Sequence, residues 1–215
     1  FKEVIKEWEK YYIDIYHSDV QNRDMSPVDS QVSTKKNKSK VHFHSFAHNP
    51  QKNLVAYATD NLNKKEIWLQ DFSSPKRKRI FKMGHKVDEL SDYSYPLIAW
   101  HPSGELLAFL VEQKGFIKLY YYILETKAIE KQSVFGVDKI HSMAYSPDGT
   151  SLLVSATMNG QSDIFLYHLQ SKTFEQITKD IFDDQNPSFV YDGKYIAFSS
   201  NRISDTLTMS RETFI

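Results

Sequence analysis

The sequence predicts an all-β fold: a β-propeller of four-stranded blades, with about four blades in an incomplete ring, preceded by one amphipathic helix. Three observations lead to this prediction. A short turn followed by an apolar strand recurs four times along the 215 residues. The copies lie roughly 45 residues apart, which is the spacing of propeller blades. Aromatic residues make up 14% of the chain, and such residues favour the half-buried surfaces of β-sheets.

The four copies of the turn and its strand span 49–57, 101–109, 146–154 and 190–198. In such a turn proline presets φ at the second position, aspartate caps the turn, and glycine adopts the left-handed conformation that ends it. The chain has only seven glycines, and three of them share this position. The residues predicted to have this structural role are Pro102, Gly104, Pro147, Asp148, Gly149, Asp192 and Gly193. In the first copy Lys52 replaces the glycine, so that turn should be looser or differently shaped.

Each turn is flanked in the same way, which gives the outline of a blade. A large side chain lies two residues before the proline position; these are His48, Trp100, Tyr145 and Phe189. A third strand follows each of the first three turns, at 66–72, 116–124 and 162–169. A fourth strand should end near Phe81, Val134 and Ile177. Four strands joined by short turns make one propeller blade, so we expect blades at 41–82, 88–134 and 135–178, with a partial blade at 179–215.

The first residues have a different pattern. Between Phe1 and Tyr16 apolar residues recur at helical spacing, with Lys, Glu and Asp at most other positions. We therefore expect 1–17 to form an amphipathic helix with one buried face, ending a preceding domain. Residues 18–40 are polar and lack periodicity, which predicts a linker.

Composition and motifs exclude several classes of function. Lys and Arg number 27 and Asp and Glu 27, a balance that argues against nucleic-acid binding. The absence of cysteine excludes disulfides and thiolate metal sites. No apolar run is long enough to span a membrane. No Gly-x-Ser-x-Gly elbow, phosphate-binding loop, dinucleotide fingerprint or His-Glu-x-x-His zinc motif occurs. We therefore assign no catalytic, cofactor-binding or metal-binding residue in this chain.

Three histidines and two aspartates are the candidate ion ligands. His42 and His44 should share one face of a strand, with His48 nearby, so a metal site is conceivable. No clear carboxylate partner lies beside them, which favours solvated or hydrogen-bonded histidines. Asp183 and Asp184 offer oxygen ligands for a cation, but a loop entering a blade also uses aspartates to cap turns.

Two further runs have simple structural interpretations. The basic run 76–79 suggests an anionic partner, but it fits better as the exposed outer strand of the first blade, where charges discourage edge-to-edge pairing. The tyrosines at 120–122 alternate faces in a strand, so they should pack between blades and not stack on a ligand.

The third and fourth repeats carry a resemblance. The run 146–149 with 160–167 and 176–178, and the run 183–193 with 196–202, resemble the repeat of TolB-type propellers. The resemblance covers about 41–202 and implies a TolB-like (PD40, WD40-like) β-propeller. The order of parts is similar to that of large TolB-like cell-envelope proteins of Bacteroidota, in which a metallopeptidase-like helical domain precedes the propeller. This resemblance implies a periplasmic or outer-membrane-associated location.

Two hypotheses about function follow. The first is a non-catalytic scaffold for protein–protein interaction, the propeller module of a larger cell-envelope protein, with protein partners in an envelope complex. The alternative is the gating propeller of a peptidase whose catalytic domain lies outside this sequence. Because propeller blades bury their faces against neighbours, four blades should leave apolar faces that further blades or a partner chain would cover.

Overall fold

The computed structural model describes residues 2–21, 41–74, 76–85, 93–134, 136–202 and 212–214. The chain divides into two units, Phe1–Thr34 and Lys35–Ile215. The predicted linker at 18–40 overlaps the end of the helix in the first unit, and 22–40 lie outside the described residues.

Helix α1 (Lys2–Gln21) carries the apolar stripe that the spacing predicts. Aromatic rings one turn apart pack along it, with centroids 4.8 Å apart for Trp8 and Tyr12 and 6.1 Å apart for Tyr12 and Tyr16. Within the described residues the stripe is exposed: Trp8 is 62% and Tyr16 52% exposed. Among the residues that the structure describes, no helix combines the length and the apolar character needed to cross a membrane.

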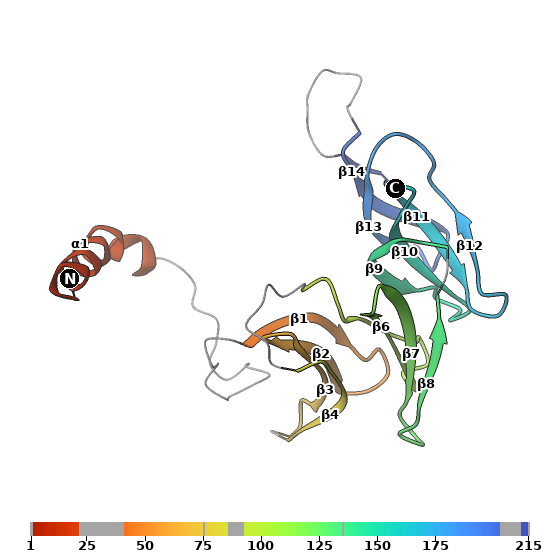
Figure 1. The fold of residues 1–215 in the computed structure, drawn as a ribbon, viewed down its shortest axis with the longest axis horizontal. Helices are drawn as coiled ribbons and strands as arrows, with labels where there is room; N and C mark the ends of the chain where they lie inside the picture. Colours follow the sequence, from red (N-terminus) through yellow and green to blue (C-terminus); the bar gives the residue numbers. More distant parts are fainter. Residues whose placement is uncertain are drawn as a thin grey trace. The chain divides into compact units, whose positions relative to one another are not determined.

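The second unit consists of four antiparallel sheets (Figure 1). The first three sheets have the strand orders β1-β2-β3-β4, β5-β6-β7-β8 and β9-β10-β11-β12, and the fourth has β13-β14-β15. The strands are β1 (Val41–His48), β2 (Leu54–Asn61), β3 (Lys64–Asp71), β4 (Arg77–Met83), β5 (Leu97–Trp100), β6 (Leu106–Gln113), β7 (Phe116–Ile123), β8 (Ile129–Ser133), β9 (Lys139–Tyr145), β10 (Ser151–Met158), β11 (Gln161–His168), β12 (Thr173–Gln176), β13 (Asp184–Val190), β14 (Tyr195–Ser200) and β15 (Glu212–Phe214).

Successive side chains of a strand point to opposite faces of its sheet, so the second sheet packs against a neighbouring sheet on each face. In β6, Leu107 and Phe109 face the first sheet, where they pack with Ile67, while Leu110 faces the third sheet and packs with Val154. All five side chains are at most 1% exposed. The main hydrophobic cores therefore lie between adjacent sheets. Burying a side chain of this size contributes about 1.5–3 kcal/mol to stability.

The sheets follow one another in chain order around an arc. Strand β1 contacts β5, β5 contacts β9, and β9 contacts β13, so the first strand of each sheet lies on the inner side of the arc. Within the described ranges the ring is not closed (Figure 1). The predicted all-β class, the four-stranded blades and the incomplete ring are confirmed.

Candidate functional site

The repeated turns of successive sheets stack on one another. The turn that joins β1 and β2 lies against the turn that joins β5 and β6: Asn49 Nδ2 donates to the Gly104 carbonyl oxygen at 2.7 Å, and Gln51 Nε2 donates to the Pro102 carbonyl oxygen at 3.2 Å. Asn49 is fully buried, and its Oδ1 also accepts from the backbone N–H of Gln51 and of Lys52 at 2.9 Å. Lys52 has no positive φ, and Leu54 N–H donates to its carbonyl oxygen instead, so the first turn is differently shaped, as predicted.

The turn glycines are needed for space as well as for φ. Gly104 has a φ of +72°, and a Cβ there would lie 2.6 Å from Asn49 Oδ1. At Gly149, with φ +75°, it would lie 2.0 Å from His101 Nε2. At Gly193, with φ +86°, it would lie 3.1 Å from Pro147 Cγ. The turns of the second, third and fourth sheets therefore each accept a side chain from the turn of the preceding sheet.

The two turn aspartates behave differently. Asp148 Oδ1 accepts from Ser146 Oγ at 2.5 Å and from Thr150 N–H at 3.0 Å, as a capping residue does. The hydrogen bond from Ser146, with those from Thr150, lowers the pKa of Asp148. Asp192 instead has a left-handed φ of 55°, and its side chain makes no hydrogen bond among the described residues. Aspartate tolerates this conformation better than most residues, so conformation and not capping explains its position.

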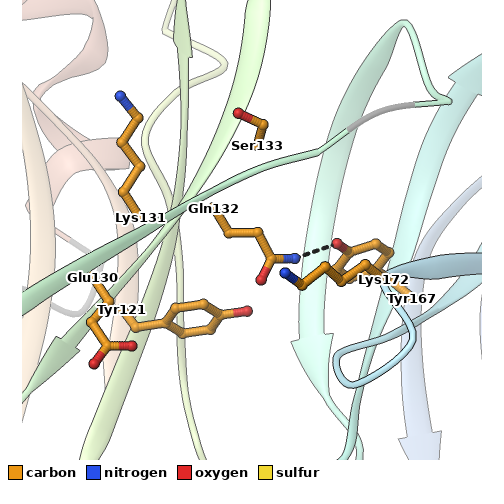
Figure 2. Close-up of a pocket in the computed structure, with 7 residues that line it drawn as sticks. All are labelled: Tyr121, Glu130, Lys131, Gln132, Ser133, Tyr167 and Lys172. Atoms are coloured by element: carbon orange, nitrogen blue, oxygen red, sulfur yellow. Dashed lines mark hydrogen bonds between the residues drawn. The ribbon is translucent and has the colours of Figure 1, made fainter.

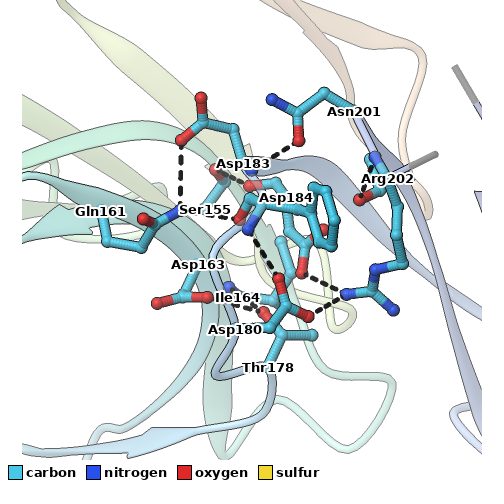
Figure 3. A network of polar contacts seen from close by, with 12 residues as sticks. Ser155, Gln161, Asp163, Ile164, Thr178, Asp180, Asp183, Asp184, Asn201 and Arg202 are labelled. Carbon is cyan, nitrogen blue, oxygen red and sulfur yellow. Dashed lines mark hydrogen bonds and ion pairs between the residues drawn. The ribbon is translucent and has the colours of Figure 1, made fainter. Parts of the chain in front are cut away.

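A polar network joins the third and fourth sheets (Figure 3). Asp184 is fully buried, and Arg202 Nη2 lies 3.4 Å from its Oδ2. Arg202 also pairs with Asp180. Asp163, 3% exposed, accepts from Gln176 Nε2 at 3.0 Å and from Thr178 Oγ1 at 3.3 Å. Burial, with Asp184 and Asp180 nearby, raises the pKa of Asp163.

The predicted pair Asp183 and Asp184 is split by this arrangement. Ser155 Oγ donates to the Asp184 carbonyl oxygen at 3.0 Å and fixes β13 against β10. The exposed Asp183 belongs to the loop: its N–H donates to Asn201 Oδ1 at 2.8 Å. The structure thus assigns Asp184 to the sheet–sheet contact and Asp183 to the entry of the last sheet. No cluster of three or more metal-ligating side chains occurs in the described ranges.

Asp163 gives the network a pH dependence with a definite sign. Because its folded-state pKa is raised, ionisation destabilises the fold, and this cost appears as pH rises from about 4 through the folded-state pKa. The free-energy difference between Asp163→Asn and wild type should therefore move in favour of the variant between pH 4 and 7. Asp148→Asn is the control: the pKa of Asp148 is lowered, so the stabilisation by its carboxylate is lost as pH falls below about 4, and the difference between this variant and wild type should stay nearly constant between pH 4 and 7. Urea unfolding at each pH measures both; parallel pH profiles would contradict this prediction.

The three histidines do not converge. The ring of His42 packs against that of Tyr93 at a tilt of 37°, with centroids 4.4 Å apart. His44 is partly buried on the same face, where burial lowers its pKa. A β-bulge at Ser45, with φ 51°, reverses the alternation, so that His48 lies on the opposite face and stacks on Phe72 at 6.0 Å. This bulge could not be read from the sequence.

The face of the first sheet that points away from the second sheet carries an aromatic and cationic cluster. We call it the Trp68 face; it comprises Phe43, Phe46, Tyr57, Trp68, Arg77 and Arg79. The guanidinium carbons of Arg77 and Arg79 lie 4.4 and 5.8 Å from the Trp68 ring centroid. Such cation–π contacts hold the indole in place.

The Trp68 face is partly ordered by its own polar contacts. Arg77 Nη1 donates to Tyr57 Oη at 3.2 Å. Glu66 pairs with Arg79 and Lys64, both at 2.7 Å; burial acts to raise the pKa of Glu66, but the two cations outweigh it and the pKa is lowered. Phe46 remains 61% exposed at the edge of the cluster. The basic run thus lies on the outer strand β4, as predicted, but its arginines serve this face.

Residues 82–206 match the family profile of the TolB beta propeller domain, PD40. The chain belongs to the TolB β-propeller family. A search of curated protein sequences finds no match.

Solved TolB-type propellers share the fold. A TolB from Acinetobacter baumannii is similar with a TM-score of 0.60 and 21% identity, covering 74% of this chain and 37% of that one. A protein described as TolB from Agrobacterium tumefaciens gives 0.58 and 18%, covering 73% and 53%. The propeller also resembles a chain from a structural study of two prolyl endopeptidases, with 0.57 and 14%, covering 90% and 29%. This TolB-type chain therefore spans about half or less of the length of these proteins.

The sequence of this TolB-type propeller does not reveal which residues join its sheets or form the Trp68 face. Asp163 and Arg202 lie far from Asp184 in sequence and meet it only because β11, β13 and β14 come together. Trp68 carried no signal of its own. Its partners Arg77 and Arg79 lie two residues apart on β4. Residues two apart in a strand point to the same face, so the sequence indicates that the two arginines share one.

Proposed function

We propose that this propeller is a non-catalytic interaction scaffold, a module of a larger cell-envelope protein in the periplasm or at the outer membrane, and that it binds protein partners. Family membership supports the envelope location. The observation that carries the binding role is the Trp68 face. Trp, Tyr and Arg are the residue types that dominate binding energy in protein interfaces, and here they gather on one sheet face.

The chemistry of the Trp68 face defines the partner. At the same positions of the second sheet, the face toward its neighbour carries Leu107 and Phe109, whereas the Trp68 face adds arginines beside its aromatic rings. Glu66 already neutralises part of Arg79. A partner segment with an apolar side chain over Phe46 and a carboxylate toward Arg77 would complement it.

A photo-crosslinking experiment on the full-length protein in cells tests this proposal. Phe46 replaced by p-benzoylphenylalanine should crosslink to a partner protein on irradiation. The matched control places the same residue at Phe116, which is 57% exposed at the start of β7. Arg77→Glu should reduce the yield at position 46 by about tenfold, the effect of losing one interfacial charge pair.

Two outcomes would contradict the scaffold role. The first is equal crosslinking from positions 46 and 116, which would mean non-specific contact. The second is a product that joins position 46 only to another segment of the same polypeptide, which would assign the Trp68 face to closure of the propeller ring.

A further inference from the structure

A groove of about 520 Å³ lies between the outer strand of the second sheet and the third sheet (Figure 2). We call it the β8–β11 groove. The residues that line it are Tyr121, Glu130, Lys131, Gln132, Ser133, Tyr167 and Lys172. Its volume falls within the range of pockets that bind small ligands. The groove is separate from the Trp68 face, which lies on the first sheet and points away from the second sheet.

Strand alternation decides which of these side chains serve the groove. Glu130 and Gln132 pair across the sheet with Tyr121 and Leu119, which face the third sheet. Lys131 points the other way, with its Nζ 5.9 Å from the Tyr120 ring centroid. Lys131 therefore contributes little charge to the groove, and the cation that remains is Lys172.

Hydrogen-bond donors converge at one end. Gln132 Nε2 donates to Tyr167 Oη at 2.6 Å; the Tyr167 proton is therefore left for another acceptor. Tyr167 is 3% exposed, so this pair is fixed in place. Figure 2 shows the Tyr121 hydroxyl and the Lys172 ammonium directed toward Gln132 from different sides. Burial raises the pKa of Tyr121 and of Tyr167, so both phenols remain neutral donors.

The other end of the groove is acidic. In Figure 2 the Glu130 carboxylate lies beside the backbone end of Tyr121, away from its hydroxyl and from Lys172. The groove therefore presents a carboxylate at one end, an aromatic ring in the middle, and an ammonium with two phenols at the other. Lys172 makes no ion pair among the described residues, which leaves its charge available to a ligand.

We propose that the β8–β11 groove binds short zwitterionic peptides, with the peptide carboxylate at Lys172, Gln132 and Tyr167 and the peptide ammonium at Glu130. The volume accommodates a ligand of two or three residues. Charge-assisted hydrogen bonds at both ends fix the direction of the chain. This site goes beyond the scaffold role and does not rest on it.

Titration calorimetry of the full-length protein with trialanine tests the proposal, beside N-acetyl-trialanine, trialanine amide and inorganic phosphate. Trialanine should bind, and capping either end should weaken binding about tenfold, the loss expected for one charge-assisted contact. In Lys172→Ala the free acid and the amide should bind alike. In Glu130→Gln the free and acetylated amines should bind alike.

Lys127→Ala is the matched control. Lys127 occupies the equivalent turn of the second sheet, has the same φ of 60° as Lys172, and makes the same backbone hydrogen bond to the residue four positions earlier. This variant should leave trialanine binding unchanged, as should Arg77→Glu on the Trp68 face. Tyr121→Phe, which removes only a hydroxyl, should weaken binding of the free acid but not of the amide.

Three results would overturn the proposal: no heat of binding with trialanine at millimolar concentration, equal loss in Lys127→Ala and Lys172→Ala, or phosphate binding as tightly as trialanine in the same site. The last would reduce the groove to an anion site. Loss of crosslinking at position 46 with intact trialanine binding would contradict the scaffold role alone.

Discussion

Replacing Gly104 by alanine is expected to destabilise the propeller by about 3 kcal/mol. A left-handed φ costs alanine about 1–2 kcal/mol, and φ at Gly104 is +72°. The new Cβ would also lie 2.6 Å from Asn49 Oδ1. Asn49 is fully buried and holds three hydrogen bonds, so moving it leaves buried groups unsatisfied, which costs about 1–3 kcal/mol.

Gly115→Ala separates the two contributions to this loss. Gly115 has a φ of +75°, and nothing lies within 4 Å of the position of a Cβ there. Its substitution should cost only the conformational part, about 1–2 kcal/mol. Urea denaturation followed by tryptophan fluorescence measures both variants. Asn49→Ala should cost much less in the Gly104→Ala background than in wild type. Equal losses at the two glycines would show that the stacked turns contribute nothing.

Arg202→Ala is expected to cost about 2–3 kcal/mol of stability. Arg202 lies 3.4 Å from the fully buried carboxylate of Asp184, and removing one partner of a buried pair typically costs about 3–5 kcal/mol. We place the value below that range because the arginine side chain is 31% exposed and partly screened by water. The free energy of unfolding in urea at pH 7 measures the loss.

Two further variants test whether the carboxylate causes this loss. Asp184→Asn should restore most of the stability of Arg202→Ala, because the amide carries no charge to leave uncompensated. Arg202 has one further contact, since its guanidinium carbon lies 5.8 Å from the Phe182 ring centroid. Arg77→Ala is the matched control: its guanidinium carbon lies 4.4 Å from the Trp68 ring centroid, but it faces no fully buried carboxylate in the described structure. That substitution should cost less than about 1 kcal/mol. A loss at Arg77 as large as at Arg202 would assign the effect to the cation–π contact.

The periodic features of this fold could be predicted from the sequence. The recurring turn predicts the number of sheets, and the three consecutive tyrosines at 120–122 predict that rings on β7 point to both faces of its sheet. The positions of Gly104 and Gly149 follow from turn chemistry alone. Their second role does not, because it depends on Asn49 and His101, one blade earlier, and no local pattern connects a turn with the turn of another sheet.

The residues of the polar network and of the Trp68 face illustrate the same limit. Asp184 and Arg202 are brought together by the pairing of β13 with β14, which has a register shift of its own. The bulge at Ser45 places Phe46 on the Trp68 face and moves His48 away from His44. A single extra residue in a strand reverses its facing pattern, and no residue type in β1 marks where that residue is inserted.

The stacked turns restrict how this propeller could arise by duplication. The turns of the second, third and fourth sheets each receive a different side chain from the sheet before: Asn49, His101 and Pro147, respectively. A duplicated blade would carry two parts of these contacts. One is the side chain that packs into the turn of the next sheet, and the other is the glycine that receives a side chain from the sheet before. Exchanging two blades would therefore mismatch a contact at every new junction, so these superficially equivalent repeats are bound to one order along the chain.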